Sequence, residues 1–116
     1  MSAEEYLKPY DEAYEAMHDV AIQANNTQTL TPPMLYGVLG NLRGTAASLS
    51  EILPSAARAA RAGAAGLDLY DAEGNDPDEQ LALTLRTLED ATGIAQQLLA
   101  LLDTAQSGIA SVGYRD

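Results

Sequence analysis

The hydrophobic and polar positions of the chain follow the period of an α-helix over three separate segments. In the first, apolar residues recur every three or four positions from Tyr6 to Ala24, and the polar run "NNTQT" follows them. Pro9 suits the first position of a helix, so the pattern predicts a regular helix over about residues 9–26. The "SAEE" stretch nearer the terminus also fits a capping box, which would begin a helix earlier.

The second segment starts at "LTPP", where Thr31 can cap a helix and Pro32 can occupy its first turn. Its apolar stripe advances in steps of four and three residues: Leu35, Leu39, Leu42, Ala46, Leu49 and Leu53. We expect a helix over residues 32–65 that is interrupted at Pro54, because a proline inside a helix removes a backbone hydrogen bond. The interruption is either a kink or the start of a further helix.

The third segment has the clearest helix start in the chain. Asp76 can act as the cap, Pro77 takes the first helical position, and Glu79 lies where a capping-box carboxylate belongs. The apolar pattern continues to Val112 and predicts a helix over residues 77–112. At about 100° per residue its apolar arc spans roughly 200°, about twice that of an ordinary surface helix. Three large residues widen the arc: Leu83, Ile94 and Leu101.

Together these segments predict one all-α domain over residues 1–116: an antiparallel three-helix bundle built on a long helical hairpin. A four-helix bundle results if the second helix folds back at Pro54. The second and third helices would each be roughly 50 Å long at about 1.5 Å per residue, and the first is much shorter. The first helix therefore cannot cover the whole hairpin, and we expect the uncovered part to meet another chain.

Three glycines interrupt the second helix at Gly37, Gly40 and Gly44. Each costs about 1 kcal/mol relative to alanine in a helix interior. On a helical wheel they lie roughly 140–200° from Leu35, on the side opposite the leucine stripe. Two interpretations stay open: a second contact face where another backbone comes close, or a solvent-exposed face on which poor helix formers are tolerated.

The net charge of the chain disfavours some classes of binding partner. Seventeen acidic residues against six basic ones give a formal charge of −11, the reverse of what direct nucleic-acid binding or an anionic membrane surface requires. No apolar run approaches the roughly 20 residues needed to span a bilayer, and the acidic N-terminus does not fit a signal peptide. We therefore expect a cytoplasmic protein. The middle of the chain, residues 27–66, is mildly basic and lies between two acidic segments.

The residues that usually carry chemistry are sparse, and we predict no catalytic, cofactor-binding or metal site. The chain has no cysteine and one histidine. Glu15 and His18 have the spacing of one half-motif of a di-iron bundle, which needs that motif twice and two further glutamates. The loop over residues 68–79 holds six carboxylates, but its glycine spacing differs from that of a calcium loop. A solvated loop is the favoured interpretation, and cation binding there stays open.

The "TPPMLYGVLGNL" helix start and the "LLDTAQSGIASVGYRD" ending are similar to those of small, alanine-rich helical proteins of actinomycetes. The resemblance implies a helical fold and carries no assignment of a catalytic activity.

The sequence therefore predicts a non-enzymatic helical module for protein–protein interaction that self-associates, most simply as a homodimer, without a small-molecule substrate. Its candidate interface residues are Gly37, Gly40, Gly44, Leu83, Ile94 and Leu101. The alternative is an acidic inhibitor that mimics nucleic acid and binds a basic protein.

Overall fold

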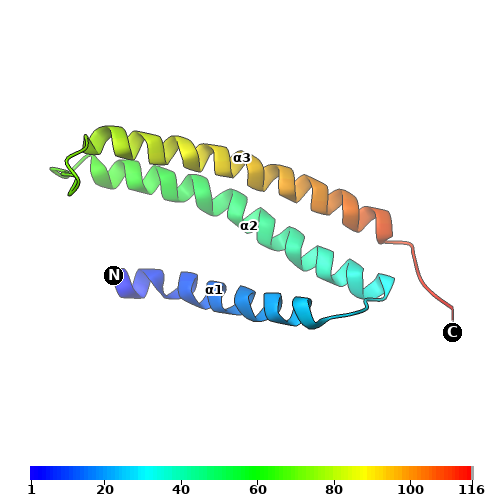
Figure 1. Ribbon diagram of the computed structural model, residues 1–116. Coiled ribbons are helices and arrows are strands. Elements are labelled where there is room, and N and C mark those ends of the chain that lie inside the picture. The colour runs from blue at the N-terminus through cyan, green and yellow to red at the C-terminus, as the bar shows by residue number, and fades with distance from the viewer. Residues whose placement is uncertain (116) are drawn as a thin grey trace. The chain divides into compact units, whose positions relative to one another are not determined.

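The computed structural model describes residues 1–115, which form three α-helices and no β-strand: α1 (Ala3–Asn26), α2 (Pro32–Ala64) and α3 (Pro77–Ile109) (Figure 1). The all-α class predicted from the hydrophobic period is confirmed. The chain divides into two compact units, Met1–Thr31 and the residues from Pro32 onward. Each unit is described by itself below.

Helix α1 begins at Ala3, six residues before the start expected from Pro9. The reason is the cap, since the Ser2 hydroxyl accepts a hydrogen bond of 3.1 Å from the backbone N–H of Glu5. Pro9 therefore lies inside the helix, where it removes one backbone hydrogen bond without ending the helix. All of the side chains of α1 are exposed.

Helix α2 continues through Pro54 as a single helix of 33 residues. The helix therefore does not end at Pro54, and no further helix starts there to make a fourth. Pro54 cannot donate to the carbonyl of Ser50, but half-buried Leu53 and buried Ala57 face the neighbouring helix on either side of it. Packing of both residues keeps the helix continuous, because tertiary contacts supply most helix stability in proteins.

Helix α3 starts as the sequence predicts, with Pro77 as its first residue. The Asp76 carboxylate accepts a hydrogen bond of 2.9 Å from the N–H of Asp78. In the loop before it, the Asp71 side chain accepts from the N–H of Asn75 at 2.8 Å, and Gly74 takes a positive φ of 84°. The helix ends at Ile109, three residues before the expected end at Val112.

Helices α2 and α3 pack side by side as an antiparallel hairpin (Figure 1). Two cross-helix contacts fix the pairing: the Arg43 guanidinium lies 3.2 Å from the Asp103 carboxylate, and the Gln106 amide donates to the Tyr36 carbonyl at 3.5 Å. The leucine stripe of α2 faces α3 around buried Ala46, as its spacing predicts, except that Leu49, at the edge of the stripe, is 41% exposed.

The core of the hairpin is thin. Among residues 1–115 the buried side chains are Ala46, Ala57, Leu85 and Ala95, and three of these four are alanine. Small residues at the contact let two helices approach closely, but they remove little apolar surface from water. Most of the larger side chains of the hairpin are therefore half-buried or exposed.

Candidate interaction surface

Helix α3 carries a second row of large apolar side chains besides the stripe that packs on α2. Leu83, Ile94 and Leu101, the three residues that widen its apolar arc, are 53%, 64% and 69% exposed. Leu98 extends the same row and is also exposed. At about 100° per residue, this row lies roughly 120° around the helix from the side that packs on α2. Within the hairpin, α2 therefore covers only one part of the arc.

Helix α2 has a matching row that the sequence-based reasoning missed. Val38, Leu49 and Ile52 are all exposed. At about 100° per residue they lie roughly 60–120° around the helix from Ala46, all on the same side of the buried stripe. The available signal was the spacing of Val38 and Ile52, which are fourteen residues apart and thus share a side of the helix after four turns.

The two rows lie on the same side of the hairpin. Viewed from its own N-terminus, each helix has its exposed row displaced from its packing stripe in the same rotational sense. Two antiparallel helices are related by an approximate two-fold axis that is perpendicular to the plane containing both helix axes. A rotation about this axis exchanges the two helices, but it does not exchange the two sides of the plane. Equal displacements therefore place both rows on one side. We call this surface the apolar face: Val38, Leu49, Ile52, Leu83, Ile94, Leu98 and Leu101.

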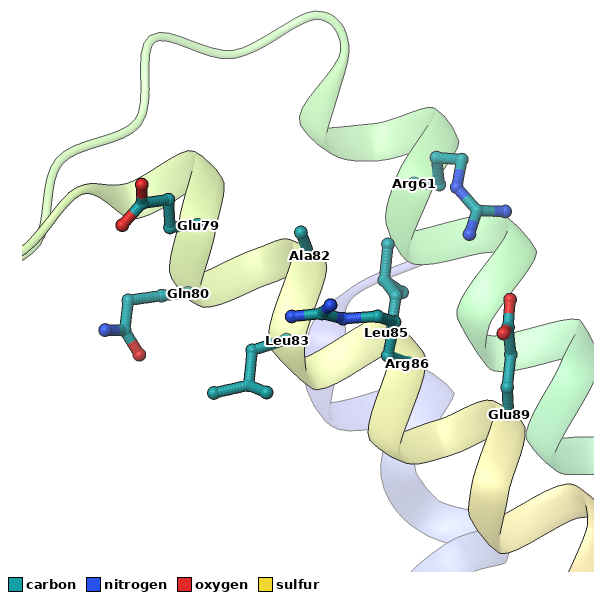
Figure 2. A pocket seen from close by; sticks show the side chains of 8 residues that line it. All are labelled: Arg61, Glu79, Gln80, Ala82, Leu83, Leu85, Arg86 and Glu89. Carbon is teal, nitrogen blue, oxygen red and sulfur yellow. The ribbon is translucent and has the colours of Figure 1, made fainter.

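The other side of the hairpin is polar. It carries the Arg43–Asp103 ion pair and the Gln106–Tyr36 hydrogen bond. Nearer the loop between the helices, Arg61 of α2 and Glu89 of α3 point toward one another and line a shallow hollow, whose lining continues around α3 to Leu83 of the apolar face (Figure 2). We call this side the polar face. Contacts between charged and amide groups of α2 and α3 thus gather on one side of the pair.

The structure does not bring the three glycines together. Gly40 lies at the edge of the contact with α3, where an added Cβ would meet the amide nitrogen of Gln106 at 2.7 Å. Gly37 and Gly44 are exposed, and an added Cβ would meet nothing within 4 Å at either position. The wheel placed Gly40 nearest to the packing stripe, but it could not show that the long side chain of Gln106 reaches it. The glycine side of α2 therefore consists of Gly37 and Gly44.

The candidate chemical groups lie on exposed elements. His18 stacks on Tyr14 in α1, with ring centroids 6.2 Å apart, and Glu15, three residues earlier, is exposed. In the acidic loop, Asp71 and Asp76 use their carboxylates to build the turn and the start of α3. Across residues 1–115, no cluster of three or more histidine, cysteine or acidic side chains is arranged to hold a metal ion.

Two tyrosines of α1 interact directly. The rings of Tyr6 and Tyr10 lie 5.9 Å apart. A side-chain hydrogen bond with Tyr6 raises the pKa of Tyr10 above its usual value, and the charge of Tyr6 adds to the effect. Because both rings are exposed on one face of α1, the pair belongs to the apolar stripe of that helix.

No helix in the described part of the chain combines the length and the apolar character that crossing a membrane requires. Comparison with protein-family models, with curated proteins and with solved structures gives no match. The similarity to alanine-rich actinomycete proteins therefore stays a prediction, and the function has to be argued from the surfaces of the chain itself.

Proposed function

We propose that the chain is a non-enzymatic protein–protein interaction module that self-associates through the apolar face of its α2–α3 hairpin. The observation that carries the proposal is the exposed row on α3, where Ile94 and Leu101 leave about two thirds of their surface in water. Fully burying a large aliphatic side chain is worth roughly 1.5–3 kcal/mol. A contiguous apolar row bordered by polar residues is typical of an interaction site.

The thin core of the hairpin supports the same proposal. Domains are normally built from at least two packed layers around a common core. Two helices whose buried side chains are Ala46, Ala57, Leu85 and Ala95 supply little apolar burial of their own. A further layer over the apolar face would bury the larger aliphatic side chains that the hairpin leaves exposed, and association would therefore stabilise the fold itself.

We propose that α1 packs antiparallel on the side of α2 that faces away from α3, so that the three helices lie in a row with α2 in the middle, in place of the antiparallel three-helix bundle expected from the sequence. The connection between α1 and α2 spans only residues 27–31, and short connections favour antiparallel neighbours. Gly37 and Gly44 leave room for another backbone to come close. The exposed apolar stripe of α1, which includes Tyr10 and Met17, would pack there and leave the apolar face for a partner.

Sedimentation equilibrium of the full chain tests self-association. Across the micromolar range the weight-average mass should rise from that of one chain toward that of two. A variant with Ile94→Glu should stay monomeric at the highest concentration, while Gln97→Glu, an exposed change of the same charge on the same helix, should associate like the wild type. A wild-type chain that stays monomeric throughout would contradict the proposal.

The formal charge of −11 favours a second candidate function, an acidic inhibitor that mimics nucleic acid and binds a basic protein. The two functions differ in their response to salt. Self-association brings two strongly acidic chains together, so screening should strengthen it, whereas binding to a basic protein should weaken. Binding to a purified histone that duplex DNA displaces and that high salt abolishes would support the inhibitor.

A further inference from the structure

We propose that the apolar face pairs with the same face of a second copy, so that two hairpins form one four-helix core around a two-fold axis perpendicular to the helices. This inference rests on the proposed function and specifies its geometry. It places the axis at the level of Ile52 and Ile94. Arg43 and Asp103 contact each other, so they lie at the same height along the hairpin. Ile52 lies nine residues after Arg43 in α2, and Ile94 lies nine residues before Asp103 in the antiparallel α3, so Ile52 and Ile94 also lie at the same height.

The dimensions of the face favour a second hairpin as its occupant. A helix of 33 residues is about 50 Å long at about 1.5 Å per residue, and two packed helices are about 20 Å wide. One face of the hairpin thus offers on the order of 1,000 Å², close to the roughly 800 Å² that each partner contributes to a standard interface. With 24 residues, α1 would cover about 36 Å by 11 Å, less than half of that area.

The composition of the face also suits a self-complementary contact. In a two-fold interface the same patch serves both copies, so it must be able to pack against itself. The apolar face consists of seven aliphatic side chains drawn from both helices. The polar face carries the Arg43–Asp103 ion pair, and Arg61 and Glu89 line a hollow nearer the loop.

The distribution of charge selects the direction of the axis. The loop over residues 68–79 carries six carboxylates at one end of the hairpin. An axis parallel to the helices would place the two loops at the same end, where they would repel each other. An axis perpendicular to the helices places them at opposite ends of a core about 50 Å long, well beyond the screening length of about 8 Å at physiological salt. The perpendicular axis is therefore favoured.

Single cysteines provide a direct test, because the natural chain has none. Near a perpendicular two-fold axis a residue lies beside its own copy. The variants Ile52→Cys and Ile94→Cys should therefore form a covalent dimer rapidly under mild oxidation of the full chain. Two matched variants should not: Gly44→Cys, on the glycine side of α2, and Leu83→Cys, on the apolar face but eleven residues from the axis.

Each other crosslinking result has a different consequence for the proposed dimer. Crosslinking at Gly44 and not at Ile52, in a chain that dimerises by sedimentation, overturns this geometry and leaves self-association intact. Crosslinking at Leu83 overturns the perpendicular axis. A disulfide within one chain between cysteines at Tyr10 and Ile52 would show that α1 occupies the face, which overturns the inference. A chain that is monomeric by sedimentation contradicts the proposed function as well.

Discussion

The polar and apolar faces of the α2–α3 hairpin differ in how far their side chains contact one another within the hairpin. On the polar face, Arg43 meets Asp103 and Gln106 reaches the backbone of α2, so side chains of the hairpin satisfy one another. On the apolar face, the rows from both helices remain 39–69% exposed. The difference shows that the apolar residues of each helix form two groups: one stripe joins the helices, and a second row stays exposed on the hairpin.

The largest expected effect comes from placing a charge on the apolar face. Ile94→Glu should weaken self-association at least about 100-fold, which corresponds to about 2.7 kcal/mol, because the interface would have to bury a carboxylate beside its copy. Sedimentation equilibrium measures the change, and Gln97→Glu is the control. Equal affinities for the two variants would show that the apolar face is not the interface.

Enlarging a buried side chain between α2 and α3 tests the observed packing of the two helices. Ala46 is only 1% exposed, so Ala46→Leu should destabilise the chain by about 1–3 kcal/mol through overpacking. Ala59→Leu, at an exposed position of the same helix, should change the free energy of unfolding by less than about 0.5 kcal/mol. Urea unfolding compares them. A tolerated leucine at position 46 would argue against the observed pairing of the helices.

The glycine side can be examined with alanine. On an open helix surface, Gly37→Ala and Gly44→Ala should each stabilise the chain by about 1 kcal/mol. If α1 packs closely there, as proposed, this gain should be absent or reversed. Gly40→Ala is the internal comparison, because its new methyl group has only to displace the end of the Gln106 side chain. A full gain at both outer glycines, measured by urea unfolding, would remove α1 from this side.

The helix caps should have effects of similar or smaller size. Asp76→Ala removes the acceptor for the N–H of Asp78 and should lower stability by about 1 kcal/mol. Asp68→Ala, a change of the same charge in the loop, is the matched control and should have little effect. Thermal unfolding followed by circular dichroism measures both. If the two variants behave alike, the charge of Asp76 matters more than its hydrogen bond.

The smallest expected effect is at the ion pair of the polar face. Both side chains of the Arg43–Asp103 pair are about half exposed, so Arg43→Ala should cost no more than about 0.5 kcal/mol, and less at high salt. Urea unfolding at low and high salt measures this. A cost above 1 kcal/mol, on the order of a buried interaction, would mean that this face is covered in solution.

The sequence predicted the parts of the fold that depend on local signals. The starts of α2 and α3 follow from Pro32 and from the Asp76–Pro77 pair. The width of the apolar arc placed Leu83, Ile94 and Leu101 outside the stripe that packs on α2, and their role as interface residues stays a prediction. The start of α1 was misplaced because two local signals competed, and the Ser2 cap outweighs the preference of Pro9 for a first turn.

The remaining features depend on how the helices pair, which the sequence pattern alone does not encode. The continuity of α2 at Pro54 rests on contacts with α3 that lie far away in the sequence. The separation of Gly40 from the other glycines depends on Gln106, sixty-six residues further along. The apolar face could be recognised only once the antiparallel pairing placed both exposed rows on one side.

Oxidative crosslinking of the Ile52→Cys chain tests the central claim most directly. A covalent dimer that forms rapidly at position 52, and not in the Gly44→Cys chain, is the expected result, and it should form faster as salt screens the acidic chains. A chain that remains uncrosslinked at position 52, at concentrations where sedimentation shows dimers, would contradict the claim that two apolar faces meet.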